Sequence, residues 1–161
     1  KPSIVYSVDD KFTTNFMTLL NRLPFMPLYY DGKTKFSPIH VLDVVDILIK
    51  IIDDKPQKLT LECIGPEVLS FQEILNQLLH TIKKKRILLP LPLPLAKMSA
   101  KFLQLFPNPL LTEDQLNLLR YDNVKSGIHK TNFDLGLDAN RKFSEEIEKY
   151  SYNWRSGGQF A

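Results

Sequence analysis

The fold is indicated most clearly by the stretch LTLECIGPEVLSFQEILNQLL, residues Leu59–Leu79, whose pattern changes from β-type to helical at its centre. Its opening residues are typical of a buried strand, and the Gly65-Pro66 pair ends that strand. Ser70 and Glu73 then form a capping box, and apolar residues recur at helical spacing for about three turns. We therefore predict a strand, a turn and a helix in this order.

Two similar transitions lie upstream. Residues 3–6 are β-prone and typical of a short buried strand, and Asp9 and Asp10 follow as candidate N-caps of an amphipathic helix. Residues 28–41 are extended around a turn at Asp31-Gly32, and the apolar helical pattern that follows ends near residue 54. A strand that leads directly into a helix is typical of an α/β fold.

The second half of the chain continues this alternation. Residues 87–91 are a candidate edge strand, and Pro94 can occupy the first turn of the next helix. A second capping box, Thr112 with Gln115, begins a further helix, and a last helix is expected over 144–152. About three or four short strands among about five or six helices favour an α/β fold, but they are too few for an independent doubly wound sheet.

The composition is that of one globular domain. The chain has 161 residues, of which 43% are hydrophobic and 24% charged, values that are typical of neither disordered nor membrane proteins. The net charge is only +3, and the dense basic run Lys83–Arg86 lies at a predicted helix end, so we expect no nucleic-acid partner. Prolines interrupt the most apolar window, residues 87–96, and we expect no transmembrane segment. The chain opens at Lys1 without a signal peptide, which we interpret as a cut end.

Motifs for catalysis, phosphate binding and metal binding are absent from the sequence. None of the six glycines forms a G-x-G-x-x-G loop. The spacing Tyr-x-x-x-Lys occurs at Tyr29 and at Tyr121, but neither pair lies within a predicted helix, where the two side chains would share a face. The three histidines are far apart and Cys63 is the only cysteine, so we expect neither a metal site nor an internal disulfide. We therefore assign no catalytic residue.

One histidine is better placed than the others. His40 ends an extended segment directly before a helix whose first turn holds Asp43. Ligands of open α/β sheets gather at the C-terminal ends of strands, so this pair could touch a ligand. The alternative is a structural hydrogen bond, with Asp43 capping the helix, and the sequence leaves both interpretations open.

Four segments together resemble the second half of the extended short-chain dehydrogenases and epimerases. They are KPSIVYS (1–7), FSPIHVLDVVDILIKII (36–52), LTLECIGPEVLSFQEILNQLL (59–79) and DLGL (134–137). The resemblance implies the last strands of a Rossmann sheet together with a mostly helical substrate-binding lobe. Residues 1–161 would then form a single substrate-side domain, and the N-terminal nucleotide-binding half would lie outside this chain.

The same resemblance implies positions for a bound NADP or NAD, which the missing half would mainly hold. The family's R-P-x-x-V/I-Y-G strand borders the nicotinamide, which implies Pro2, Ser3 and Ile4 as cofactor contacts, although Lys and Ser replace the terminal Arg and Gly here. His40 is a further expected contact, because it lies where the chain returns to the Rossmann domain. The expected substrate-pocket residues are Tyr6, Phe12, Phe16 and Phe36.

A narrower resemblance covers nearly the whole chain. The segments GPEVLSFQEIL, LPLPLPLAKM, LLTEDQLNLLRYDN, DLGL and GGQF are similar to bacterial relatives of the NADPH-binding accessory subunit of mitochondrial complex I. This similarity implies a non-catalytic accessory or assembly role as the alternative to an NAD(P)-dependent oxidoreductase or epimerase, with respiratory complex I subunits as partners. The lack of targeting signals leads us to expect a cytoplasmic protein, which the similarity would place peripheral to the inner membrane. A third alternative is a gene remnant without activity.

Overall fold

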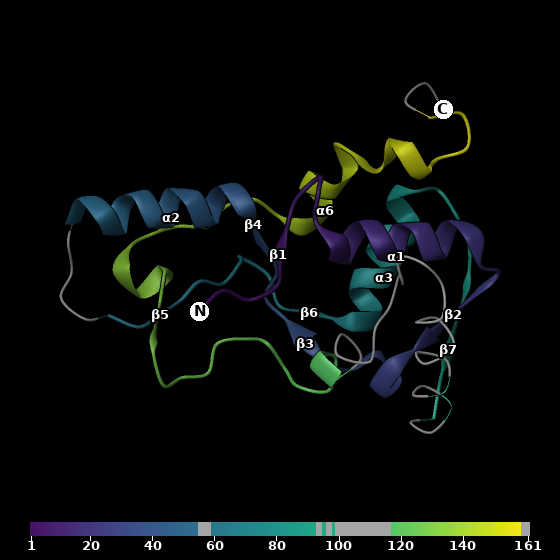
Figure 1. Cartoon of the computed structure of the whole chain (residues 1–161), viewed down its shortest axis with the longest axis horizontal. Coiled ribbons are helices and arrows are strands. Elements are labelled where there is room, and N and C mark those ends of the chain that lie inside the picture. Colours follow the sequence, from purple (N-terminus) through teal and green to yellow (C-terminus); the bar gives the residue numbers. More distant parts are fainter. Residues whose placement is uncertain (55–58, 93–94, 96–97, 99–116, 159–161) are drawn as a thin grey trace.

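The computed structural model describes residues 1–54, 59–92, 95, 98 and 117–158 (Figure 1). The strands are β1 (Val5–Tyr6), β2 (Phe25–Leu28), β3 (Lys35–Phe36), β4 (Ile39–His40), β5 (Leu61–Glu62), β6 (Leu69–Ser70), β7 (Ile87–Pro90) and β8 (Lys130–Thr131). The helices are α1 (Lys11–Arg22), α2 (Val41–Asp54), α3 (Phe71–Thr81) and α6 (Phe143–Glu148), and the 3-10 turns are η1 (Tyr29–Gly32), η2 (Phe133–Leu135) and η3 (Ser151–Trp154).

Short parallel strands connect the predicted strand-to-helix units to one another. β1 pairs with β4 through Val5 opposite Ile39, and Pro2 makes a parallel bridge to Cys63 directly after β5. β5 in turn pairs in parallel with β8. α2 begins at the residue after β4, so a strand leads directly into a helix here. The predicted α/β class is confirmed, although the strands are shorter than the predicted runs.

A second group of strands lies beside α1 and α3 (Figure 1). β2 and β7 are parallel and pair from Phe25 opposite Ile87 to Leu28 opposite Pro90. β3 and β6 are antiparallel and pair just before α3 begins. The predicted strand over 87–91 is therefore confirmed, and its partner is a segment far upstream in the sequence.

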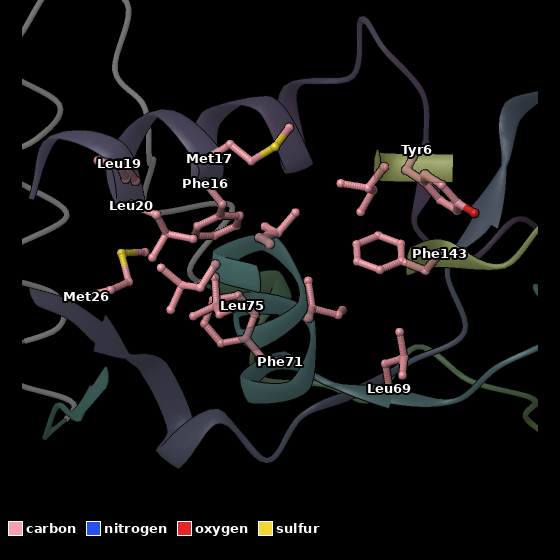
Figure 2. Close-up of a cluster of buried hydrophobic side chains, with 14 of the residues drawn as sticks. Tyr6, Phe16, Met17, Leu19, Leu20, Met26, Leu69, Phe71, Leu75 and Phe143 are labelled. Atoms are coloured by element: carbon pink, nitrogen blue, oxygen red, sulfur yellow. The ribbon is translucent and has the colours of Figure 1, made fainter. Parts of the chain in front are cut away.

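The main core lies between α1 and α3. Phe71 and Leu75 of α3 lie beside Phe16 and Leu20 of α1 in Figure 2, and all four side chains are buried. The ring centroids of Phe16 and Phe71 are 5.2 Å apart in an edge-on arrangement, which is a favourable geometry for two aromatic rings. Both helices were expected from the spacing of their apolar residues, and both are confirmed.

Both helices also begin at the expected caps. The Ser70 hydroxyl accepts the backbone N–H of Glu73 at 3.2 Å, and the Glu73 carboxylate accepts the backbone N–H of Ser70 at 2.7 Å. Hydrogen bonds from the Ser70 backbone and side chain hold the pKa of Glu73 below its usual range. Asp10 caps α1 by accepting the Thr13 N–H at 2.6 Å. Each cap joins residues three apart, so a short sequence window contains the whole signal.

α2 has nearly the predicted bounds, but much of its apolar face is exposed. Helical spacing of the apolar residues predicts one face packed against the rest of the protein. Instead Val45, Leu48, Ile49 and Ile52 are between 42% and 69% exposed, while Ile47 is buried. Figure 1 shows α2 extending away from α1 and α3. Spacing identifies the apolar face, but it does not specify which segment covers that face.

The tail helix is shorter than predicted. α6 ends at Glu148 and the 3-10 turn η3 follows, whereas the sequence predicts a continuous helix over 144–152. Its three predicted apolar side chains, Phe143, Ile147 and Tyr150, are nevertheless buried in the main core. The tail therefore packs as expected, although its backbone changes conformation within the last turn.

Two predictions fall outside the described residues. They are the helix that begins at Pro94 and the capping box of Thr112 with Gln115. Within the first of these, the two residues that the structure describes, Leu95 and Met98, are helical. Among the helices in the described ranges, none combines the length and the apolar character needed to cross a bilayer.

Candidate functional site

Four of the residues expected near a ligand converge on one cavity beside β1. Ile4, Phe12, Phe16 and Phe36 all line a cavity of about 260 Å³. Ile4 immediately precedes β1, the two α1 phenylalanines come from the first half of that helix, and Phe36 ends β3. Residues that are far apart in sequence therefore form a single wall of aromatic and aliphatic side chains.

The three phenylalanine rings are packed against one another. The centroid of Phe12 lies 5.0 Å from that of Phe16 and 6.4 Å from that of Phe36, within the range of favourable aromatic pairs. Phe16 and Phe36 are buried and belong to the main core, whereas Phe12 is only half-buried. Phe12 is thus the aromatic residue of this group that is most available to a ligand.

The opposite wall comes from a segment that sequence reasoning did not assign to the site. It consists of Leu118, Leu119, Tyr121, Asp122 and Asn123. Backbone contacts with β3 hold it in place, since the Asn123 N–H donates to the Lys35 carbonyl at 2.8 Å and the Lys35 N–H donates to the Asp122 carboxylate at 2.8 Å. No local pattern in the sequence pairs these two segments, which lie more than eighty residues apart.

Two polar side chains of α1 also line the cavity and were not predicted. They are Lys11 and Asn15. Lys11 and Asn15 are one helical turn apart and therefore share a face of α1. The helical pattern identifies Phe12 and Phe16 as core residues of α1. It does not indicate that polar residues of the same helix line the cavity with them.

Ser3 is engaged in structural hydrogen bonds. Its backbone N–H donates to the Cys63 carbonyl at 2.9 Å, and its hydroxyl donates to the Asn123 carbonyl at 2.7 Å. The same hydroxyl accepts the Ser37 N–H at 3.2 Å. Ser3 therefore joins β1 to three other segments at the edge of the cavity, and the neighbouring Pro2 makes the bridge to Cys63.

Tyr6 and His40 form a cluster of their own and are not among the described residues that line the cavity. Their ring centroids are 5.2 Å apart, and Tyr6 also packs edge-on against Phe143 (Figure 2). The Tyr6 hydroxyl donates to the Arg141 carbonyl at 3.1 Å, and the Leu42 N–H donates to His40 Nδ1 at 3.3 Å. Burial raises the pKa of Tyr6 and lowers the pKa of His40, so it favours the neutral form of both rings.

Asp43 has a structural partner rather than a ligand in this cluster. Its buried carboxylate accepts hydrogen bonds from the backbone N–H of Arg141 at 3.3 Å and from the Arg141 guanidinium. The guanidinium also donates to Asp46 at 3.1 Å, and these carboxylates, Asp46 first, raise the pKa of Arg141. Of the two interpretations of His40 and Asp43, this geometry favours the structural one. The residues differ from the expected cap, because His40 accepts the Leu42 N–H at the start of α2 and the Asp43 carboxylate binds Arg141 of the tail.

The described residues place neither a metal-binding group nor a Tyr-x-x-x-Lys pair in catalytic geometry. Across residues 1–54, 59–92 and 117–158, no group of His, Cys, Asp and Glu could hold a metal ion. Tyr29 and Lys33 do not share a helix face, because Tyr30 and Asp31 between them have positive φ values. Tyr121 and Lys125 lie in irregular backbone. Neither Tyr-x-x-x-Lys pair therefore has catalytic geometry.

Comparison with known proteins gives two sequence relatives that carry the same protein name. The chain is 25% identical over 98% of its length to the mitochondrial NADH dehydrogenase (ubiquinone) 1 alpha subcomplex subunit 9 of Arabidopsis thaliana, and it spans 42% of that protein. It is 24% identical over 99% of its length to the protein of the same name from Dictyostelium discoideum, and it spans 46% of it. The chain thus spans less than half the length of these relatives. No protein-family model matches the chain.

Solved structures share the fold at lower sequence identity. A dTDP-4-dehydrorhamnose reductase from Clostridium acetobutylicum superposes with a TM-score of 0.59 and 15% identity, over 92% of this chain and 45% of the reductase. The UDP-glucose 4-epimerase of Thermus thermophilus, solved in complex with NAD, gives a TM-score of 0.57 and 15% identity, over 96% of this chain and 45% of the epimerase. The chain is therefore a distant homologue of the mitochondrial subunit 9 proteins, and its α/β fold matches a part of the NAD-dependent epimerase and dehydratase structures.

Proposed function

We propose that this chain is the C-terminal, substrate-side part of an NAD(P)-binding protein of the epimerase, dehydratase or reductase type. The observation that carries the proposal is the cavity beside β1, at the point where a parallel strand leads into α1. Ligands of open α/β sheets gather at such strand ends. The reductase and the epimerase compared above, the latter solved with NAD, are each matched over 45% of their length, which supports a nucleotide-binding half outside this chain.

The cofactor would lie along the start of β1, held mainly by the other half. In this proposal Pro2, Ser3 and Ile4 contact the nicotinamide end through backbone and aliphatic atoms, because the polar groups of Ser3 are already engaged within the chain. His40, which ends the neighbouring β4 opposite Tyr6, is the further cofactor contact in this proposal. The phenylalanine-lined cavity next to Ile4 would then receive the substrate or an equivalent bound group.

The exposed face of α2 is where the nucleotide-binding half would pack. Leu48, Ile49 and Ile52 form a contiguous apolar surface on this helix, and soluble proteins seldom leave such a surface uncovered. The relatives are more than twice as long as this chain, so each contains a large segment with no counterpart here. We therefore propose the protein's own Rossmann half as the occupant of this face.

Substitution of Ile49 by Ser tests that packing. Ile49 is 54% exposed in this chain, so covering the rest of its side chain would remove about half of its surface from water. In the complete protein, Ile49→Ser should lower the free energy of unfolding by about 1.5 kcal/mol, measured by urea denaturation. The neighbouring exposed residue provides a control, Lys50→Ser, which should leave stability almost unchanged. Equal stability of the two variants would contradict the docking proposal.

The cofactor proposal is tested on the complete natural protein. NADPH fluorescence should rise and shift on titration with the protein, and the change should saturate, because a bound nicotinamide is shielded from water. The titration is repeated with NADH to choose between the two cofactors. The absence of any saturable change with either nucleotide would overturn the proposed function. Turnover is not part of the proposal.

A second candidate function is a non-catalytic accessory or assembly role in respiratory complex I. It is favoured by the two sequence relatives, which are both named as subunits of NADH dehydrogenase and match 98% or more of the chain. Such a role is compatible with NADPH binding and would place the protein at the inner membrane. Purification of the tagged complete protein should then recover complex I subunits in constant proportion, and their repeated absence would count against this role.

A further inference from the structure

We propose that the cavity beside β1 binds an uncharged aromatic or fused-ring group, and that it does not bind a sugar nucleotide. This inference rests on the proposed function, because it names the class of ligand for the same pocket. The epimerase and reductase that share the fold are named for sugar nucleotides, which carry a diphosphate. The charge of this cavity is unsuited to a sugar nucleotide, and its shape and size suit an uncharged aromatic group.

The charge of the lining is unsuited to a diphosphate. Of the described lining residues, Lys11 is the only cation and Asp122 is an anion, so the net charge of the lining is zero. A diphosphate needs several donors, and arginine is the residue that binds phosphate oxygens in pairs. Arg120 is not among the lining residues, and its guanidinium lies 5.6 Å from the centre of the Tyr121 ring. Two negative charges would therefore enter this apolar site with little compensation.

The shape of the lining suits an aromatic ring. Phe12 packs edge-on against Phe16 and is tilted at 56° to Phe36, so rings with different orientations surround one space. Aromatic groups are stabilised by edge-to-face and offset contacts of this kind, in addition to the burial of their surface. Tyr121 adds a fourth aromatic side chain from the opposite wall.

The size and the few polar groups of the cavity narrow the ligand further. An engineered apolar cavity of about 150 Å³ binds benzene, so a cavity of about 260 Å³ can hold a larger group, such as two fused rings. Asn15 and Asn123 are the uncharged polar residues among the described lining residues. Ligand pockets commonly use a small number of such groups to orient a bound molecule. A carbonyl or hydroxyl substituent on the ring would match an amide such as that of Asn123.

The test uses the complete natural protein and N-phenyl-1-naphthylamine, a neutral probe whose fluorescence rises in apolar sites. We expect saturable binding that UDP-glucose does not reverse. Asn15→Trp, which fills the cavity, should weaken binding by about tenfold. The matched control Asn21→Trp introduces the same residue on α1 outside the cavity and should leave binding unchanged. Leu118→Trp, at a position on the opposite wall that is 70% exposed, provides a second blocking variant with little risk to folding.

The outcomes separate this inference from the proposed function, because NADPH binding is titrated on the same samples. Displacement of the probe by UDP-glucose would overturn the inference, as would equal probe affinity in the wild-type protein and both blocking variants. Failure of the probe to bind a protein that binds NADPH would also overturn it. If the probe binds as expected but the protein does not bind NADPH, the proposed function is overturned and the ligand class of the cavity is supported.

Discussion

Gly65→Ala should destabilise the protein by at least about 3 kcal/mol, the upper end of the usual cost of overpacking a core. A Cβ atom at this position would lie 1.6 Å from the carbonyl oxygen of Pro38 and 3.3 Å from the Cα atom of Ile39. The obstruction is backbone, so no side chain can rotate away. The Gly65 N–H also donates to the Ser37 carbonyl at 3.1 Å, and moving the two segments apart would lengthen that bond.

The measurement is the free energy of unfolding from urea denaturation, compared with that of Gly127→Ala. Gly127 has a φ of +76° but nothing within 4 Å of its would-be Cβ atom. The Gly127→Ala variant therefore has only the left-handed backbone strain, which costs about 1 kcal/mol. A Gly65→Ala variant that is no less stable than Gly127→Ala would show that the two segments are not in close contact.

The Gly65 contact also positions the candidate site. It holds residues 37–39 against Gly65, three residues after β5 ends, and Phe36 and His40 lie on either side of that stretch. A shift of this stretch would move one wall of the cavity and the residue that begins α2. Gly65 is therefore required because two backbones approach each other closely at this position. The sequence indicates only that Gly65 ends a strand.

Local signals explain why the helices could be predicted from the sequence. The Ser70 and Glu73 capping box and the Asp10 cap each join residues that are three apart, and the apolar faces of α1 and α3 repeat at helical spacing. Such patterns lie within one window of sequence, and in this chain the tertiary contacts agree with them. The same holds for the turn at Asp31, where the positive φ suits the Asp-Gly pair.

The cavity could be predicted only in part, because half of it has no local signal. Phe12 and Phe36 were expected near a ligand through the family resemblance, and both line the cavity. Asp122, through its carboxylate, and Asn123, through its N–H, are held at the cavity by hydrogen bonds with the Lys35 backbone, which depend on the tertiary fold. The exposure of α2 was missed for the same reason, since periodicity shows that a face is apolar and contains no information on the segment that covers it.

Asp43 and Arg141 form the other interaction that the sequence did not reveal, and it gives the second large expected effect. The two residues are 98 positions apart, and their contact joins the start of α2 to the tail. Asp43 is only 3% exposed, so Arg141→Ala would leave a buried carboxylate without its main partner. Loss of one partner of a buried pair costs about 3–5 kcal/mol, but a third of the Arg141 side chain is exposed, and we expect about 2–3 kcal/mol.

Urea denaturation of Arg141→Ala should be compared with that of Lys33→Ala, which removes a highly exposed ion pair with Asp31 and should cost less than about 0.5 kcal/mol. Adding Asp43→Asn to the Arg141→Ala variant should then recover part of the lost stability, because an uncharged amide is easier to bury than an unpaired carboxylate. If the second substitution lowers stability further, the carboxylate is solvated once Arg141 is removed, and the buried pair does not fix the tail against α2.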